Sequence, residues 1–182
     1  MIHVELKDFA KNISKYLSQD IEFISHSDKM YVLRGANNDI NEEFCKANDI
    51  EIIDINHEGG SIVLDKSAIG YAYIAQDNAL KLQKNFMLRF VDWLNMKGVV
   101  AEYKDNDILI EDYKVCSAGT KILSNGLTYT TIHFSLKNDA ELISKICLKP
   151  MKKIPKGLSD WGITADDIME FLKQNTFVRG DR

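Results

Sequence analysis

The sequence lacks the features that mark membrane-spanning and secreted proteins. No apolar run approaches the roughly 18 residues that a helix needs to cross a bilayer, and residues 1–20 hold no continuous apolar stretch like that of a signal peptide. The cysteines, Cys45, Cys116 and Cys147, are odd in number, and no pair has the C-x-x-C spacing of a metal site. We therefore expect reduced thiols, a cytoplasmic location and no membrane partner.

An excess of positive charge is also absent. The chain carries 23 Lys and Arg against 27 Asp and Glu, which gives a formal net charge of −4. Because proteins that bind nucleic acid generally present a basic face, we expect no nucleic-acid partner. A lysine-rich run at 145–156 is interpreted as a solvated face, with a local basic patch as the alternative.

Proline is scarce, and the two prolines stand close together. Pro150 and Pro155 mark an irregular stretch near the end of the chain. No internal repeat and no linker rich in Pro, Gly or Ser divides the sequence. A length of 182 residues is sufficient for a substantial core, so we expect residues 1–182 to form a single domain.

The spacing of apolar residues predicts several amphipathic helices. They cover residues 4–18, 40–48, 78–97, 139–147 and 164–174. Asp39 and Asp77 are the predicted N-caps of the second and third helices, and Gly98 ends the third. Thr164, with Asp167 three residues later, has the capping-box pattern for the last helix.

Short apolar runs bounded by turn residues predict strands between these helices. They cover residues 21–25, 30–34, 50–55, 61–65, 68–74, 99–103, 107–111, 113–122 and 127–136. The first two strands are joined by the polar turn HSDK, and hairpin signals also occur at Asp105-Asn106 and at 124–126. We therefore predict an α+β fold, with a mixed, largely antiparallel sheet and helices packed on it.

The pair Gly59-Gly60 lies at the centre of this pattern, between a strand that leads in and two strands that lead out. Two adjacent glycines after a strand can form a tight hairpin turn. They also let the backbone approach a ligand without a Cβ in the way. The sequence around the pair leaves both interpretations open.

Four stretches of the chain carry a resemblance to one family of proteins. They are YVLRGANNDINEEFCKANDIEII (31–53), HEGGSIVLD (57–65), KDNDILIEDYKVCSAGTKI (104–122) and IPKGLSDWGIT (154–164). In order and spacing they resemble segments of the biotin/lipoate protein ligase catalytic-domain family, together with its octanoyltransferase relatives. The resemblance implies the mixed α+β fold of that family's catalytic domain.

Particular residues match the family's motifs. In the second stretch, Gly59, Gly60 and Asp65 are similar to its Ser-Gly-Gly-Gly-Ala-Val-Tyr-His-Asp segment. The third resembles its Asn-Asp strand, hairpin and Lys-containing strand, with matches at Asn106, Asp107 and Lys114. The fourth resembles the octanoyltransferase segment Pro-Cys-Gly-Ile, with Lys156 at the position of the nucleophilic cysteine.

The resemblance implies an acyl ligase or acyltransferase. Such enzymes bind lipoate, octanoate or biotin beside the glycine loop, and the ligases activate the acid with ATP and Mg²⁺ before passing it to a lysine of a carrier. The expected partners are therefore a lipoyl or biotinyl carrier domain, or an acyl-carrier protein. Lys114 would contact the acyl carbonyl or the adenylate phosphate as a catalytic residue, and Asp107 would lie near the metal. The implied substrate-binding residues are His57, Gly59, Gly60, Ser61, Tyr71, Tyr73 and Thr131.

Cys116 is a second candidate catalytic residue, as the nucleophile of a thioester route. A reactive thiol requires a nearby base or cation that lowers its pKa. Because Lys114 and Cys116 are two positions apart on a predicted strand, their side chains are expected to share one face. The alternative for Cys116 is a small buried apolar residue.

Other positions depart from the family pattern and favour a different function. Asp54-Ile55 replaces a basic pair before the glycines, and His57-Glu58 replaces the first small residues of the glycine run. The His-Gly-Thr strand of the ligases is replaced by TYTTIHFSL, with Thr130, Thr131 and His133 as its polar members. A carboxylate beside a phosphate site repels the anion. The alternative is therefore a non-catalytic member that binds an acyl group or a protein.

Overall fold

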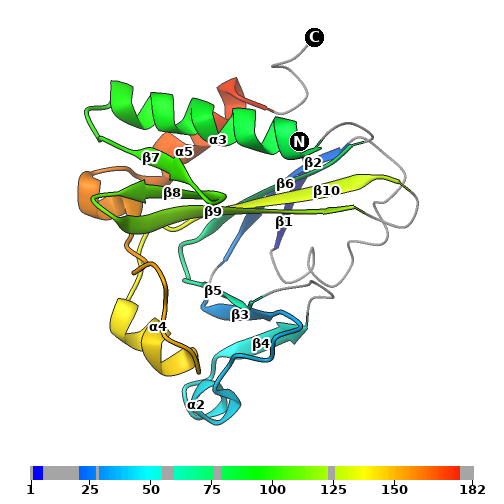
Figure 1. Ribbon diagram of the computed structural model, residues 1–182, viewed down its shortest axis with the longest axis vertical. Helices are drawn as coiled ribbons and strands as arrows, with labels where there is room; N and C mark the ends of the chain where they lie inside the picture. The colour runs from blue at the N-terminus through cyan, green and yellow to red at the C-terminus, as the bar shows by residue number, and fades with distance from the viewer. Residues whose placement is uncertain are drawn as a thin grey trace.

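Two β-sheets form the framework of the protein. The computed structural model describes residues 2–5, 21–27, 29–54, 60–75, 79–122 and 126–176. The larger sheet has seven strands in the order β1-β2-β6-β10-β9-β8-β7, and the smaller has three in the order β4-β3-β5. Helices α3 and α5 cover one side of the large sheet, while the small sheet lies on its other side with α2 and α4 (Figure 1).

The bounds of these elements follow the predicted pattern closely. The large sheet consists of β1 (Ile2–Glu5), β2 (Ile21–His26), β6 (Ile69–Ala75), β7 (Glu102–Lys104), β8 (Asp107–Ile110), β9 (Tyr113–Ile122) and β10 (Thr128–Phe134). The small sheet consists of β3 (Tyr31–Arg34), β4 (Glu51–Asp54) and β5 (Ile62–Leu64). The helices are α2 (Glu42–Ala47), α3 (Ala79–Met96), α4 (Ala140–Ile146), the 3₁₀ helix η2 (Leu158–Trp161) and α5 (Ala165–Gln174).

Strand directions confirm the predicted fold class. In the large sheet β1 and β2 are parallel, whereas the pairs β2–β6, β6–β10, β10–β9, β9–β8 and β8–β7 are antiparallel. In the small sheet β3 is parallel to β4 and antiparallel to β5. The arrangement is a mixed, largely antiparallel α+β fold whose strands divide between two sheets.

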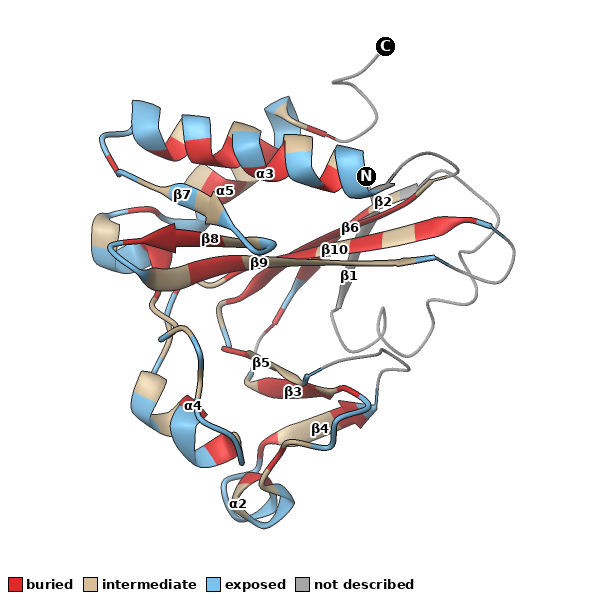
Figure 2. Ribbon diagram, viewed as in Figure 1, coloured by how far each residue is buried: buried red, intermediate tan, exposed pale blue. Residues whose placement is uncertain are grey.

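The main core lies between the large sheet and helices α3 and α5, where buried residues gather in Figure 2. The apolar stripe of α3 provides Phe86, Phe90 and Leu94, which are fully buried. Phe90 packs edge-on against Phe134 of β10, with ring centroids 4.9 Å apart. This side of the sheet is filled by side chains, so a ligand site is expected on the other side. No helix in the described ranges is both long and apolar enough to span a membrane.

Local signals for helix ends are confirmed at two places. The Thr164 side chain accepts a hydrogen bond from the backbone of Asp167, whose carboxylate accepts one from the backbone of Thr164, so the capping box is complete. Gly98 follows α3 with a φ of 83°. Asp77, the predicted cap of α3, lies outside the described residues.

Two local predictions were wrong, and a third was wrong at its start. Asn41, and not Asp39, caps α2, because its side chain accepts from the amide of Phe44. The predicted hairpin at 21–34 does not form, since β2 pairs with β6 whereas β3 pairs with β4 and β5. The predicted helix at 4–18 overlaps β1 at its start, and the rest of it lies outside the described residues.

Candidate active site

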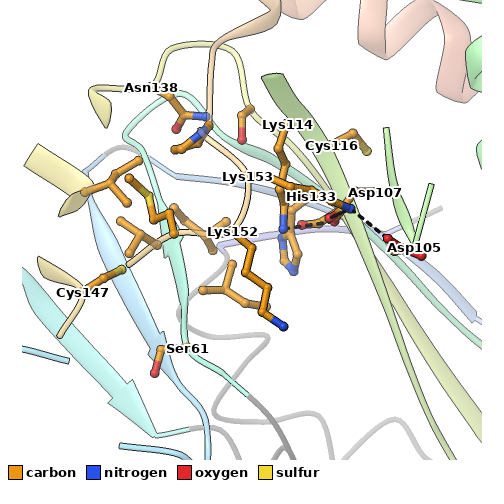
Figure 3. Close-up of a pocket in the computed structure, with 18 residues that line it drawn as sticks. Ser61, Asp105, Asp107, Lys114, Cys116, His133, Asn138, Cys147, Lys152 and Lys153 are labelled. Carbon is orange, nitrogen blue, oxygen red and sulfur yellow. Dashed lines mark hydrogen bonds and ion pairs between the residues drawn. The ribbon is translucent and has the colours of Figure 1, made fainter. Parts of the chain in front are cut away.

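A cavity of about 570 Å³ lies between the two sheets, on the side of the large sheet away from α3. Strands β8, β9 and β10 provide one wall, and β5, α4 and the segment 151–155 provide the others. Figure 3 draws the residues that line the cavity. The first wall is polar, whereas the others combine apolar Ile62, Ile143 and Met151 with Lys152 and Lys153. Such a division suits a ligand with an apolar chain and a polar end.

A β-bulge determines which side chains of β9 reach the cavity. Leu109 pairs with Lys114 and Ile108 pairs with Cys116, so Val115 is an extra residue on β9. Because a bulge reverses the alternation of side chains, Lys114 and Cys116 lie on opposite faces of the sheet. The expectation that they share one face was therefore wrong.

Cys116 consequently lies in the core. It is 1% exposed and packs with the apolar residues under α3, and Figure 3 shows its side chain directed away from Asp107 and His133. Burial raises its pKa well above the ordinary value for a thiol, and Asp107 raises it further. A nucleophilic thiol requires the opposite shift, so these surroundings do not suit the predicted catalytic role.

Lys114 lies at the polar wall of the cavity and is fixed through its backbone. Its amide donates to the carbonyl of Ile154 at 2.9 Å, and its carbonyl accepts from the amide of Lys156 at 3.0 Å. The Lys114 ammonium lies 3.0 Å from Oδ1 of Asp107. The segment around Pro155 is thereby joined to β9, and Lys114 lies beside Asp107.

Asp107 lies between two lysines. Its other oxygen, Oδ2, accepts a hydrogen bond from the Lys153 ammonium at 2.9 Å. Lys153 also donates to the carbonyl oxygen of Lys104 at 3.2 Å and lies 3.6 Å from a carboxylate oxygen of Asp105. Both carboxylate oxygens of Asp107 are therefore engaged by ammonium groups.

This donor set does not fit the predicted magnesium site. Mg²⁺ takes oxygen ligands in a near-ideal octahedron, and Asp107 has no oxygen without an ammonium partner. Among the described residues, no group of three or more His, Cys, Asp or Glu side chains is arranged to hold a metal ion. Asp107 acts here as an anchor for two lysines.

Asn106, which precedes Asp107 in the family motif, maintains the turn from which Asp107 extends. Its side-chain oxygen accepts from Gln83 at 3.0 Å and from the hydroxyl of Tyr103 at 2.9 Å. Asn106 has a φ of 65°, a left-handed conformation that asparagine tolerates better than most residues. In this pair, Asn106 forms the turn and Asp107 lines the cavity.

His133 of β10 faces the cavity beside Lys114. It is 6% exposed, and its Nδ1 atom has no hydrogen-bond partner in the described part of the chain. Burial, together with the positive charge of Lys114, lowers the pKa of His133 to about 4. The imidazole is therefore neutral near pH 7 and has a ring nitrogen available to a ligand.

This shift predicts acid sensitivity that depends on His133. Between its unfolded pKa of 6.5 and its folded pKa of about 4, the unfolded chain binds the proton more readily, so stability falls as the pH falls. The loss should approach about 3 kcal/mol by pH 4. We expect His133→Gln to remove this component from the free energy of unfolding in urea, measured from pH 7.5 to 4. Parallel pH profiles for the two proteins would contradict the assignment.

Asp39, between β3 and α2, holds Ser61, the residue that follows the glycine pair. Asp39 Oδ1 accepts from the amide of Ser61 at 3.1 Å and from its hydroxyl at 2.6 Å. A Cβ on Gly60 would lie 3.1 Å from Asp39 Oδ2, so the close approach favours glycine there. Ser61 lines the cavity, but its hydroxyl is used in this bond. Gly59 and His57 lie outside the described residues.

The other predicted substrate-binding residues do not meet in the cavity. Tyr71 and Tyr73 are buried on the α3 side of β6, where Tyr71 stacks on Phe86 with ring centroids 5.1 Å apart. Burial raises the pKa of Tyr73 to about 12. Strand alternation places both tyrosines away from this cavity, so neither of them lines it. Thr131 shares the cavity-facing side of β10 with His133 but lies beyond the lining residues.

Two functional candidates were missed from the sequence. His133 was noted only as a polar member of its strand, although its i,i+2 relation to Thr131 would have placed both on one face. Lys153 belongs to the run 145–156, which was interpreted as solvated. The Lys153 side chain is 21% exposed and forms an ion pair with Asp107. The sequence alone could not reveal this pair, because Asp107 precedes Lys153 by more than forty positions.

Comparison with known proteins now identifies the family. Residues 7–177 match the family model described as the lipoyl protein ligase A/B catalytic domain. The chain belongs to this family. A comparison with curated proteins gave no significant match.

Solved structures of lipoate ligases share this fold. A lipoate protein ligase from Thermoplasma acidophilum with bound lipoic acid is 15% identical, with a TM-score of 0.77 over 96% of this chain and 82% of that one. The same organism's bipartite ligase, studied with its lipoyl domain, is 13% identical, with a TM-score of 0.77 over 96% and 80%. Lipoate-protein ligase A bound with ATP is 16% identical, with a TM-score of 0.78 over 96% and 83%.

Proposed function

We propose that this member of the lipoyl protein ligase A/B family is an acyl ligase. It activates lipoate or octanoate, with biotin as a further candidate, as an acyl-adenylate formed from ATP, and transfers the acyl group to a lysine of a carrier domain. Support comes from the family, from similar folds with bound lipoic acid or ATP, and from a similar fold whose ligase was analysed together with its lipoyl domain. The reaction requires one site for an apolar chain and another for a reacting carboxylate.

The observation that carries this proposal is the position of Lys114. Its ammonium lies at the polar wall of a cavity whose facing walls include Ile62, Ile143 and Met151. An apolar acyl chain against those walls brings its carboxylate to the β9 side. Lys114 then neutralises the charge of the bound carboxylate and of the phosphate that joins it.

The residues around Lys114 favour transfer through the adenylate. Attack on an acyl-adenylate builds negative charge on the carbonyl oxygen, and a fixed ammonium stabilises that charge more in the transition state than in the ground state. Asp107 fixes the ammonium by a bond of 3.0 Å. The neutral ring of His133 adds a hydrogen-bonding group without a second full charge.

The cysteines give no support to a thioester route. Cys116 lies on the far face of β9 with a raised pKa, and burial also raises the pKa of Cys147, which borders the cavity. Lys156, at the position of the transferase nucleophile, lies 4.7 Å from the ring centroids of both Tyr113 and Trp161. The ligase route is therefore preferred over the transferase route.

A direct assay tests the proposal. The protein is incubated with lipoate, octanoate or biotin, together with ATP, MgCl₂ and an unmodified lipoyl domain. We expect pyrophosphate release, an acyl-adenylate detected by mass spectrometry, and a carrier domain heavier by one acyl group. Transfer from an acyl-carrier protein without ATP would instead indicate a transferase. Absence of turnover and of any thermal shift with these acids would overturn the proposed function in favour of a binding module.

A further inference from the structure

The Lys153 ammonium occupies an oxygen cradle of the kind that would otherwise suit a metal ion. Three oxygens surround it: Asp107 Oδ2 at 2.9 Å, the Lys104 carbonyl at 3.2 Å and Asp105 Oδ2 at 3.6 Å. All three come from the hairpin formed by β7 and β8. Carboxylate and carbonyl oxygens are the ligands that hard divalent cations prefer.

The fold holds Lys153 in this cradle. The next residue, Ile154, accepts a backbone hydrogen bond from Lys114 at 2.9 Å, so the segment is attached to β9. The side chain then crosses to the β7–β8 turn, where Asp107 is 14% exposed. Because it bridges two anchored elements, this ion pair is more ordered than an ordinary surface pair.

A divalent cation at Asp107 would have to displace both lysines. Lys114 occupies Oδ1 at 3.0 Å, and Lys153 occupies Oδ2. A metal bound there would leave two ammonium groups without their shared carboxylate and close to a doubly charged ion. Coulomb repulsion opposes that arrangement. Asp107 is therefore better suited to hold two lysines than to hold magnesium.

The same cluster gives the cavity an excess of positive charge. Its described lining includes Lys114, Lys152 and Lys153 against Asp105 and Asp107. Figure 3 shows Lys114 on β9 and Lys152 and Lys153 on the segment 151–155. An oxyanion that enters the cavity is attracted to these ammonium groups.

His133 provides an independent indication of a ligand. It is 6% exposed, faces the cavity, and has an Nδ1 atom without a partner among the described residues. A buried polar atom of this kind is normally satisfied by protein, water or ligand. Its position beside Lys114 places an additional polar contact where an oxyanion would lie.

We propose that Lys153 is a cation built into the chain, which supplies at Asp107 the positive charge that a divalent ion would otherwise bring. The protein then binds an oxyanion, either the carboxylate of the acyl substrate or the phosphate of its adenylate, without magnesium. The identity of these ligands rests on the proposed function. The occupation of the cradle by Lys153 rests on the geometry alone.

Isothermal titration calorimetry tests the binding role. The probes are octanoate for the carboxylate, AMP for the phosphate, and 5′-O-(N-octanoylsulfamoyl)adenosine as a stable adenylate analogue, each in EDTA and in MgCl₂. We expect the wild-type protein to bind the analogue with dissociation constants in the two buffers that agree within about twofold. Lys153→Met should weaken binding in EDTA by at least about tenfold, whereas Lys153→Arg retains most of it. Lys173→Met, the matched control on α5 outside the cavity, should stay within about twofold of the wild type.

The possible outcomes separate this inference from the proposed function. Wild-type binding that requires MgCl₂ would overturn the role of Lys153 and leave the ligase proposal intact. No binding of any probe in either buffer would overturn the ligase proposal, and with it the ligand-binding role of Lys153. Equal loss in Lys173→Met and Lys153→Met would also overturn the inference, because general charge would then explain the binding.

Electron paramagnetic resonance of Mn²⁺ tests the cradle without any organic ligand. We expect the wild-type protein to leave the spectrum of free Mn²⁺ unchanged, because Lys153 occupies the oxygens. Mn²⁺ bound by the wild type and released by Asp107→Asn would overturn the inference. Thermal melting of each variant confirms that it is folded.

Discussion

Replacing Lys114 with alanine should lower the rate of acyl-adenylate formation by about a hundredfold or more. The ammonium lies at the polar wall of the cavity, 3.0 Å from Asp107 Oδ1. Its charge is needed most when negative charge grows on the carbonyl and phosphate oxygens. The effect should therefore appear in kcat as well as in kcat/KM, measured by pyrophosphate release under saturating acid and ATP.

The structure of the Lys114→Ala variant should be little changed. The bonds that hold β9 to the segment 154–156 use the backbone of Lys114, which the substitution keeps. Asp107 retains Lys153 as a partner at 2.9 Å. Lys173→Ala, an exposed lysine of α5, is the matched control and should retain full activity. An unchanged rate in Lys114→Ala would show that the lysine was misassigned.

The sequence was most informative where a signal is local. The capping box of Thr164 and Asp167 depends on residues three apart, and it is present as predicted. The apolar stripe of α3 likewise follows from helical periodicity, and Phe86 and Phe90 are fully buried. These features require no knowledge of the partner surface, because backbone geometry alone determines them.

Strand partners were less predictable because pairing is not local. Residues 21–25 and 30–34 have the appearance of a hairpin, yet β2 joins the large sheet and β3 the small one. Each strand places a buried apolar residue on both of its faces, Phe23 and Ile24 in β2 and Val32 and Leu33 in β3, so alternation gave no indication of which neighbour each would take. Because β5 pairs with β3 in a separate small sheet, it forms a wall of the cavity opposite the large sheet.

In the candidate site, too, residues within one motif could be predicted from the sequence, whereas residues positioned by the fold could not. The motif match at Asp107 and Lys114 brings together two residues that the structure places 3.0 Å apart. The predicted position of Cys116 was wrong because it assumed a regular strand. The bulge at Val115 shifts the register and turns the Cys116 side chain to the other face of the sheet. Lys153 reaches the site only through the fold, since no motif connects it to Asp107.

Gly157→Ala should be the most destabilising small substitution near the site. A Cβ on Gly157 would overlap the carbonyl oxygen of Leu136 and lie 2.7 Å from Cα of Lys137. Real Cβ atoms are almost never found below about 3 Å from another heavy atom, so the backbone must move. We expect the free energy of unfolding to fall by about 3 kcal/mol, and the melting temperature by roughly 10 °C.

Gly119→Ala provides the matched control for this prediction. A Cβ on Gly119 would meet only Oγ1 of Thr131, at 3.8 Å, which is an ordinary contact. Its melting temperature should therefore stay close to that of the wild type in the same calorimetric scan. Equal melting temperatures for Gly157→Ala and the wild type would mean that the two backbones do not approach as closely as described.

The same substitution should also affect ligand binding, because Gly157 lies in the segment that fixes the two lysines. The amide of Leu158 donates to Ser135 at 2.8 Å, and the amide of Lys156 donates to Lys114 at 3.0 Å. Moving the backbone at Gly157 away from Leu136 strains both bonds and shifts the segment that carries Lys153. A folded Gly157→Ala protein should therefore bind the sulfamoyl analogue more weakly than Gly119→Ala does at a temperature well below either melting transition. The close approach of Gly157 to Leu136 therefore affects both the stability of the fold and the positions of Lys114 and Lys153 in the cavity.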